Sequence, residues 1–205
     1  MPCDHWNLQA WYGDAALDWR AFRWDAVGGM QDLGTLGSND SYGEDVSANG
    51  SIVVGTGAWR WTSTEVGTRY CTPAANSTGR GSLLNVLGSG MVTSNDLTLA
   101  VEFLPQGSSG CFLASRYQGA PITIAGSDGL LCLGGFIGRF VGAGQVQGAG
   151  ATGTFSLPID LTAMPTPFGA VVVQPGETWN FQAWYRNANP GPTSNFTDAV
   201  SVTFQ

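Results

Sequence analysis

Hydrophobic and polar side chains alternate along residues 176–186 with a period of two, as in a β-strand, where successive Cβ atoms point to opposite faces of the sheet. One face of this segment carries the apolar side chains of Trp179, Phe181, Ala183 and Tyr185. The opposite face carries Asn180, Gln182, Trp184 and Arg186. Because the first face must be buried, the pattern predicts a central strand of a layered β structure.

Three further segments show the same alternation. Their apolar positions are Leu97, Leu99, Val101 and Phe103 in the first, Phe155, Leu157, Ile159 and Leu161 in the second, and Val200, Val202 and Phe204 in the third. Polar or small residues separate these positions, so each segment predicts a half-buried strand. Four such strands predict a β-sandwich, because two sheets that cover one another bury all the apolar faces.

The composition indicates short strands joined by tight turns, and it argues against several classes of function. Charged residues make up 11% of the 205-residue chain, which contains 30 glycines and 10 prolines. The net charge is −7 and the eight basic residues are all arginines, so a concentrated basic surface for nucleic acid is not expected. No apolar run is long enough to span a membrane. Residues 1–6 have neither the basic nor the apolar part of a signal peptide.

Few residues could carry catalysis or hold a metal. The single histidine, His5, lies near the start of the chain, so a Ser-His-Asp triad is not expected. The four cysteines include no CxxC pair, which argues against zinc; a disulfide is preferred, with buried free thiols as the alternative. A glycoside hydrolase would need paired carboxylates, with Glu177 or Asp160 as the candidate, but alternation places Asp160 on a solvated face. The Asn and Asp residues near 39–45 and 195–198 are expected to cap turns rather than bind calcium. No metal, cofactor or enzymatic activity is therefore expected.

Trp184 is the residue best suited to bind a ligand. It shares the polar face of its strand with Asn180, Gln182 and Arg186, and proteins often hold a sugar ring on a flat aromatic side chain among hydrogen-bonding groups. These four residues are the candidate carbohydrate-binding site. The preferred interpretation is that a loop such as 190–195, or the N-terminal part of the chain, covers this face, since large aromatic side chains are seldom left bare.

Residues 1–62 contain six of the eight tryptophans and an internal repeat. Residues 21–24 read AFRW and residues 58–61 read AWRW, at an offset of 37 residues. Between them, residues 30–37 read MQDLGTLG and residues 49–55 read NGSIVVG. Repeats of this length with turn signals are typical of propeller blades and other β arrays.

This segment resembles the HAF repeat of bacterial extracellular repeat proteins over residues 21–61. One full unit covers 21–55, and a second opens at 58–61 and breaks off. Arg20 stands where the repeat usually opens with histidine. The resemblance implies a partial propeller-type β repeat and an extracellular location.

A second resemblance covers residues 69–205. Its motifs are DLTL at 96–99, FLAS at 112–115, LCLG at 131–134, IGRF at 137–140, GETWNFQAWYR at 176–186 and PGPTSNFTD at 190–198. They resemble the C-terminal immunoglobulin-like β domain of secreted or surface proteins of planctomycete-like bacteria. The resemblance implies a disulfide between Cys71 and Cys132, at the family's recurrent cysteine positions, and leaves Cys111 as a small buried side chain.

Together these features predict an all-β chain. It has a partial HAF-like repeat (a truncated propeller blade) at 1–62, a linker at 63–70 and an immunoglobulin-like β-sandwich at 71–205. The expected function is that of a non-catalytic secreted or cell-surface module for structure, adhesion or anchoring. A carbohydrate-binding module is the alternative and a glycoside hydrolase a weaker one. The expected partners are cell-surface polysaccharides or other surface proteins. An extracellular location also implies that the native signal peptide is missing from this chain.

Overall fold

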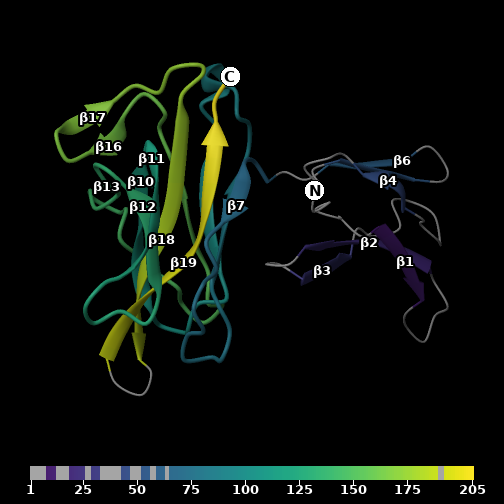
Figure 1. The fold of residues 1–205 in the computed structure, drawn as a ribbon, viewed down its shortest axis with the longest axis horizontal. Helices are drawn as coiled ribbons and strands as arrows, with labels where there is room; N and C mark the ends of the chain where they lie inside the picture. Colours follow the sequence, from purple (N-terminus) through teal and green to yellow (C-terminus); the bar gives the residue numbers. More distant parts are fainter. Residues whose placement is uncertain are drawn as a thin grey trace. The chain divides into compact units, whose positions relative to one another are not determined.

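The computed structural model describes residues 8–12, 19–25, 29–32, 43–46, 52–55, 59–62, 65–188 and 192–205. This part of the chain is all-β, as predicted: the strands pair antiparallel, and the helical content is one 3-10 turn at Val92–Ser94. The chain forms two compact units, residues 1–64 and residues 65–205 (Figure 1).

The first unit contains two three-stranded antiparallel sheets, each with its strands in chain order. The strands of one are β1 (Leu8–Tyr12), β2 (Trp19–Asp25) and β3 (Gly29–Asp32). Those of the other are β4 (Gly43–Val46), β5 (Ile52–Gly55) and β6 (Trp59–Thr62). The two copies of the aromatic-Arg-Trp sequence fall in β2 and β6, so both are strand segments.

The second unit is a β-sandwich. One layer is a six-stranded sheet of order β13-β10-β18-β19-β7, in which β14 also pairs with β10, and the facing layer has the order β15-β9-β8. Two hairpins, β11–β12 and β16–β17, complete the unit. The strand bounds are β7 Thr68–Tyr70, β8 Leu83–Leu87, β9 Thr98–Glu102, β10 Ser109–Ser115, β11 Tyr117–Thr123, β12 Leu130–Gly134, β13 Gly138–Arg139, β14 Gln147–Gly148, β15 Phe155–Pro158, β16 Met164–Thr166, β17 Gly169–Val171, β18 Thr178–Ala188 and β19 Pro192–Thr203. Residues 68–70, which the sequence analysis placed in a linker, thus form an edge strand.

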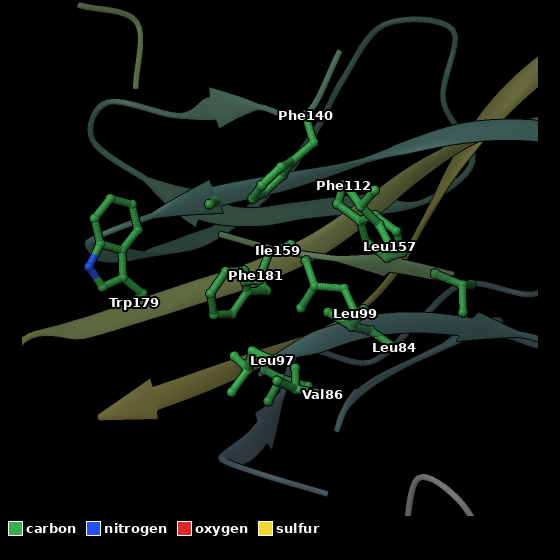
Figure 2. Packing of buried hydrophobic residues seen from close by; sticks show 14 of the residues in the cluster. Leu84, Val86, Leu97, Leu99, Phe112, Phe140, Leu157, Ile159, Trp179 and Phe181 are labelled. Carbon is green, nitrogen blue, oxygen red and sulfur yellow. The ribbon is translucent and has the colours of Figure 1, made fainter. Parts of the chain in front are cut away.

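The alternation along β18 places its apolar face in the core, as predicted. Its four apolar side chains are at most 1% exposed: Trp179, Phe181, Ala183 and Tyr185. They belong to one cluster with side chains of β8, β9, β10 and β15, and Figure 2 shows labelled members of both layers filling the space between the sheets. Burying one large apolar side chain stabilises the fold by about 1.5–3 kcal/mol, so this cluster holds the two layers together.

Phe103 is a predicted core residue that lies outside this cluster. Its φ is 62°, in the left-handed region, and β9 ends just before it at Glu102. The guanidinium of Arg80 lies 3.5 Å from the centre of the Phe103 ring. The prediction for Phe103 was wrong because the backbone leaves the extended conformation at this residue, and the alternation of the strand ends with it.

A β-bulge reverses the alternation of β19. Gln182 pairs with Ala199, but Trp184 pairs with Phe196, so β19 has one residue more than β18 over this stretch. Because of the additional residue, even-numbered side chains of β19 point to one face of the sheet after the bulge and to the other face before it. Val200 therefore lies in the core between the layers, whereas Phe196 packs in a second cluster on the outer face of the six-stranded sheet.

A buried ion pair joins the two layers at the β7 edge. Asp198 of β19 accepts hydrogen bonds from Arg69 Nη1 of β7 at 2.8 Å and from the backbone N–H of Leu84 of β8 at 2.7 Å. Arg69 also donates to the carbonyl oxygen of Leu84 at 2.7 Å and to the side chain of Asn85. Burial raises the pKa of the Asp198 carboxyl to about 6, and Arg69 with the N–H of Leu84 offsets only part of this effect.

We expect Asp198 to make the folded unit less stable as the pH rises from about 4 to about 6. The ordinary pKa of this carboxyl is 3.8, so between these values the folded state binds the proton more strongly than the unfolded state does. The stabilising contribution is complete below the lower value and is lost as the pH rises through the upper one. The measurement is the difference in unfolding free energy between the wild type and Asp198→Asn at several pH values in urea.

Asp160→Asn is the matched control for this pH dependence. Hydrogen bonds from Thr162 and Asn95 lower the pKa of the exposed Asp160 carboxyl, so its contribution to stability has the opposite sign and appears as the pH rises. A wild-type advantage over Asp198→Asn that grows between pH 4 and 6 would contradict the assignment for Asp198.

Candidate functional site

The hairpin β11–β12 covers part of the outer face of the six-stranded sheet, and Gln182 of β18 holds it there. Gln182 Nε2 donates to the carbonyl oxygens of Leu130 and Thr197, each at 2.9 Å. Its Oε1 accepts a hydrogen bond from the backbone N–H of Cys132 at 3.0 Å. The side chain is fully buried, so these bonds are made away from water and fix the position of β12 on the sheet.

A disulfide provides the second attachment of the hairpin. It joins Cys132 of β12 to Cys71, directly after β7, with the Cα atoms 6.2 Å apart, as the family resemblance implied. Cys111 is a free, buried thiol, also as expected. The hairpin loop is attached as well, because the N–H of Asp128 donates to the carbonyl oxygen of Ser194 at 2.8 Å. The hairpin is therefore attached to the sheet both through β12 and through its loop.

A cavity of about 390 Å³ lies beside this hairpin, on the outer face of the sheet. The sheet contributes a row of three neighbouring side chains to the lining. Cys111 of β10 is paired with Trp184 of β18, which is paired in turn with Phe196 of β19. Leu113, two residues further along β10, extends the same face. The bulge in β19 is what brings Phe196 to this side of the sheet.

The remaining lining comes from the hairpin and from the segment around β13. Leu131 of β12 and Ile124 of the hairpin loop form one part. Ile137, Arg139, Val141 and Val146 form the other. Val141 and Val146 are 55% and 54% exposed, so the cavity opens to solvent beside them. The lining is thus aliphatic and aromatic, with one charged side chain.

Arg139 and Cys111 are the polar or reactive groups of the lining. Arg139 is exposed on β13, where it pairs with Leu113 of β10. Burial raises the pKa of the Cys111 thiol, and the positive charge of Arg139 lowers it by a smaller amount. Because the net effect is a raised pKa, the thiol stays protonated and is not an activated nucleophile.

The four sequence-predicted ligand residues fall into two groups. Trp184 lines the cavity and is partly exposed, and the guanidinium of Arg186 lies 5.0 Å from the centre of its ring. Asn180 and Gln182 are buried within the fold. The Nδ2 of Asn180 donates to the carbonyl oxygen of Ser115 at 3.3 Å, and Gln182 holds the hairpin. Residues 192–195, expected as part of a covering loop, belong to β19 itself; the hairpin covers the face instead.

The carboxylates considered for hydrolysis are engaged in structural contacts. Glu177 pairs with Arg116 at 2.8 Å and accepts a hydrogen bond from Trp179 Nε1 at 3.0 Å. Asp160 accepts hydrogen bonds from Thr162 and Asn95, which lower its pKa. A general acid needs a raised pKa at neutral pH, so the environment of Asp160 does not suit that role.

The candidate calcium residues are partly described. Asn195 and Asp198 are buried and hydrogen-bonded inside the sandwich, while Asn39 and Asp40 lie outside the described residues and Glu44 and Asp45 lie in β4. Within the part of the chain that the structure describes, no group of three His, Cys, Asp or Glu side chains could hold a metal ion. The helical content of that same part includes no segment of the length and apolarity needed to cross a membrane.

Most of the residues that line the cavity were not predicted from the sequence. The alternation of β10, with Phe112 buried in the core, could have placed Cys111 and Leu113 on the outer face. Phe196 was hidden by the bulge, and Arg139 lies in a two-residue strand that no pattern reveals. Comparison with protein-family models, with curated proteins and with solved structures finds no match for this chain.

Proposed function

We propose that this chain is a non-catalytic extracellular or cell-surface module that binds its partner or ligand in the cavity beside Trp184. The observation that carries the proposal is a cavity of about 390 Å³ between the sheet and a hairpin fixed by a disulfide. Small-molecule sites are largely preformed, mostly apolar hollows of roughly 300–1,000 Å³, and this cavity has that character. The disulfide supports an extracellular location, since such bonds persist in oxidising compartments.

The proposal includes the finer features expected of the fold. Residues 71–205 would be immunoglobulin-like, and residues 21–61 would be a propeller-type HAF repeat that serves structure, adhesion or anchoring. The two three-stranded antiparallel sheets of the first unit support a repeat built of β-strands. Other surface proteins remain the expected partners of this unit.

The cavity lining favours an apolar ligand over a sugar. A sugar ring needs several hydrogen-bonding side chains around the aromatic platform. Asn180 and Gln182, which the carbohydrate hypothesis requires beside Trp184, are buried in the fold. The carbohydrate-binding module stays an alternative prediction, but the aliphatic lining supports apolar binding better.

The test is titration of the full-length oxidised protein with the uncharged fluorescent probe N-phenylnaphthylamine. We expect one saturable site, and Trp184→Ala should weaken binding by about tenfold or more, because it removes the aromatic surface of the cavity. Thermal unfolding of each variant establishes that it is folded. Retention on a panel of polysaccharides, lost in Trp184→Ala, would instead favour the carbohydrate alternative.

Phe136→Ala is the matched control. Phe136 and Phe168 form an exposed aromatic pair, 65% and 79% exposed with ring centres 4.9 Å apart, that could adsorb an apolar probe. Phe136→Ala should leave the affinity unchanged. If instead Phe136→Ala weakens binding and Trp184→Ala does not, the cavity is not the site.

A further inference from the structure

We propose that the cavity takes a small amphiphile, with its apolar body against Trp184 and its carboxylate paired with Arg139. This inference rests on the proposed function and adds the chemical class of the ligand. It is carried by the position of Arg139 in an otherwise apolar lining, since no carboxylate or aromatic ring among the described residues pairs with this guanidinium.

The cavity lining offers an apolar surface to a ligand. Leu113 and Phe196 are buried in the second hydrophobic cluster, and Leu131, Ile137 and Trp184 pack against it. Trp184 and the exposed Val141 and Val146 keep apolar surface open to the cavity. A ligand with an aliphatic or aromatic body would remove this surface from water, which is favourable in proportion to the apolar area covered.

Arg139 differs from the other described arginines in its contacts. Arg69 and Arg116 pair with carboxylates, and Arg80 and Arg186 lie over aromatic rings. Among the residues that the structure describes, Arg139 has no carboxylate and no aromatic ring as a partner. Its fork of five donors is therefore free to bind a planar carboxylate through two hydrogen bonds.

The charge of the whole chain makes this site selective. The net charge of −7 disfavours anions over most of the surface, so an anion gains only where a local cation faces it. Arg139 provides that cation at the cavity, whose lining otherwise carries no charged side chain. A cationic amphiphile would bring its charge beside the guanidinium and be repelled. An uncharged amphiphile would gain the apolar contact alone.

The experiment measures, by calorimetry, the affinity of the full-length oxidised protein for three ligands that share a ten-carbon apolar chain and differ in the charge of the head group. Decanoate should bind about tenfold more tightly than decanol, since a charge-assisted pair adds to the apolar contact, and decyltrimethylammonium should bind most weakly. Arg139→Gln should make decanoate and decanol bind equally. A comparison of the affinities for naphthoate and decanoate shows whether the cavity prefers an aromatic or an aliphatic carboxylate.

Arg80→Gln is the matched control, because it removes the same charge from a side chain that lies over Phe103. It should leave the preference for decanoate intact. Cys111 provides a second readout: bound decanoate should slow alkylation of this thiol, followed by peptide mass mapping, because the thiol lines the same cavity. That protection should weaken in Arg139→Gln.

Two results would overturn the inference in different ways. Equal binding of decanoate and decanol to the wild type, with the uncharged probe still bound at Trp184, would remove the carboxylate from the proposal and leave the binding function standing. Absence of binding by the uncharged probe and by all three amphiphiles would overturn the proposed function and this inference together.

Discussion

Replacing Arg69 by methionine is expected to lower the free energy of unfolding of the second unit by about 3–5 kcal/mol at pH 7. The substitution keeps an apolar stem but leaves the carboxylate of Asp198, whose side chain is 1% exposed, buried without its cation. It also removes the hydrogen bonds from Arg69 to Leu84 and Asn85, which join β7 to the facing sheet. Urea unfolding followed by circular dichroism measures the loss.

Two further variants test the cause of this loss. The double variant Arg69→Met with Asp198→Asn should recover part of the stability, because it removes the buried charge along with its partner. Arg116→Gln breaks the more exposed pair with Glu177 and should cost less than about 1 kcal/mol. A loss in Arg69→Met no larger than the loss in Arg116→Gln would show that the buried pair does not join the layers as the structure indicates.

Removal of the disulfide by the double substitution Cys71→Ala and Cys132→Ala is expected to lower the free energy of unfolding by about 4 kcal/mol. The cysteines are 61 residues apart in the sequence, and cross-linking a loop of that size restricts the unfolded chain by about this amount. The same variant should bind the uncharged probe more weakly, because the hairpin that forms one side of the cavity loses an attachment. Urea unfolding and probe titration measure the two effects.

Cys111→Ala is the control for the disulfide variant, since Cys111 is a buried cysteine outside the disulfide. It removes a single sulfur from the cavity lining and leaves the loop closed. Its loss of stability should therefore be much smaller than that of the double variant. If the double variant is as stable as Cys111→Ala, the disulfide does not stabilise the fold and the hairpin depends on Gln182 and its loop contacts alone.

The two stability predictions concern opposite sides of one sheet. Arg69 lies in β7 and joins the six-stranded sheet to β8, whereas Cys71, directly after β7, joins it to the hairpin on the outer face. One short edge strand thus fastens three parts of the unit. Residues 68–70, which look like a polar connector in the sequence, are therefore part of the sandwich. The cavity depends on this strand although no residue of β7 lines it.

The sequence by itself determined the all-β class and the inner face of the sandwich. Alternation identified Trp179, Phe181 and Tyr185 as core residues, since side chains of a strand point to opposite faces whatever surrounds it. It failed at Phe103, where a positive φ ends the strand, and it could not show the bulge that turns Phe196 outward. Both are backbone departures from the extended conformation that the pattern of side chains does not record.

The tertiary structure alone decided what the outer face of β18 does. The sequence singled out Trp184 but grouped it with Asn180 and Gln182, which alternate with the apolar positions in the same way. In the fold, Gln182 is bonded to the hairpin β11–β12 and Asn180 to Ser115 of β10, whereas Trp184 lines the cavity. The cavity draws its lining from β10, β12, β13, β18, β19 and the segments between them. Contacts between residues so distant along the chain depend on how the strands pair and pack, so no local pattern could place Arg139 in the same cavity lining as Trp184.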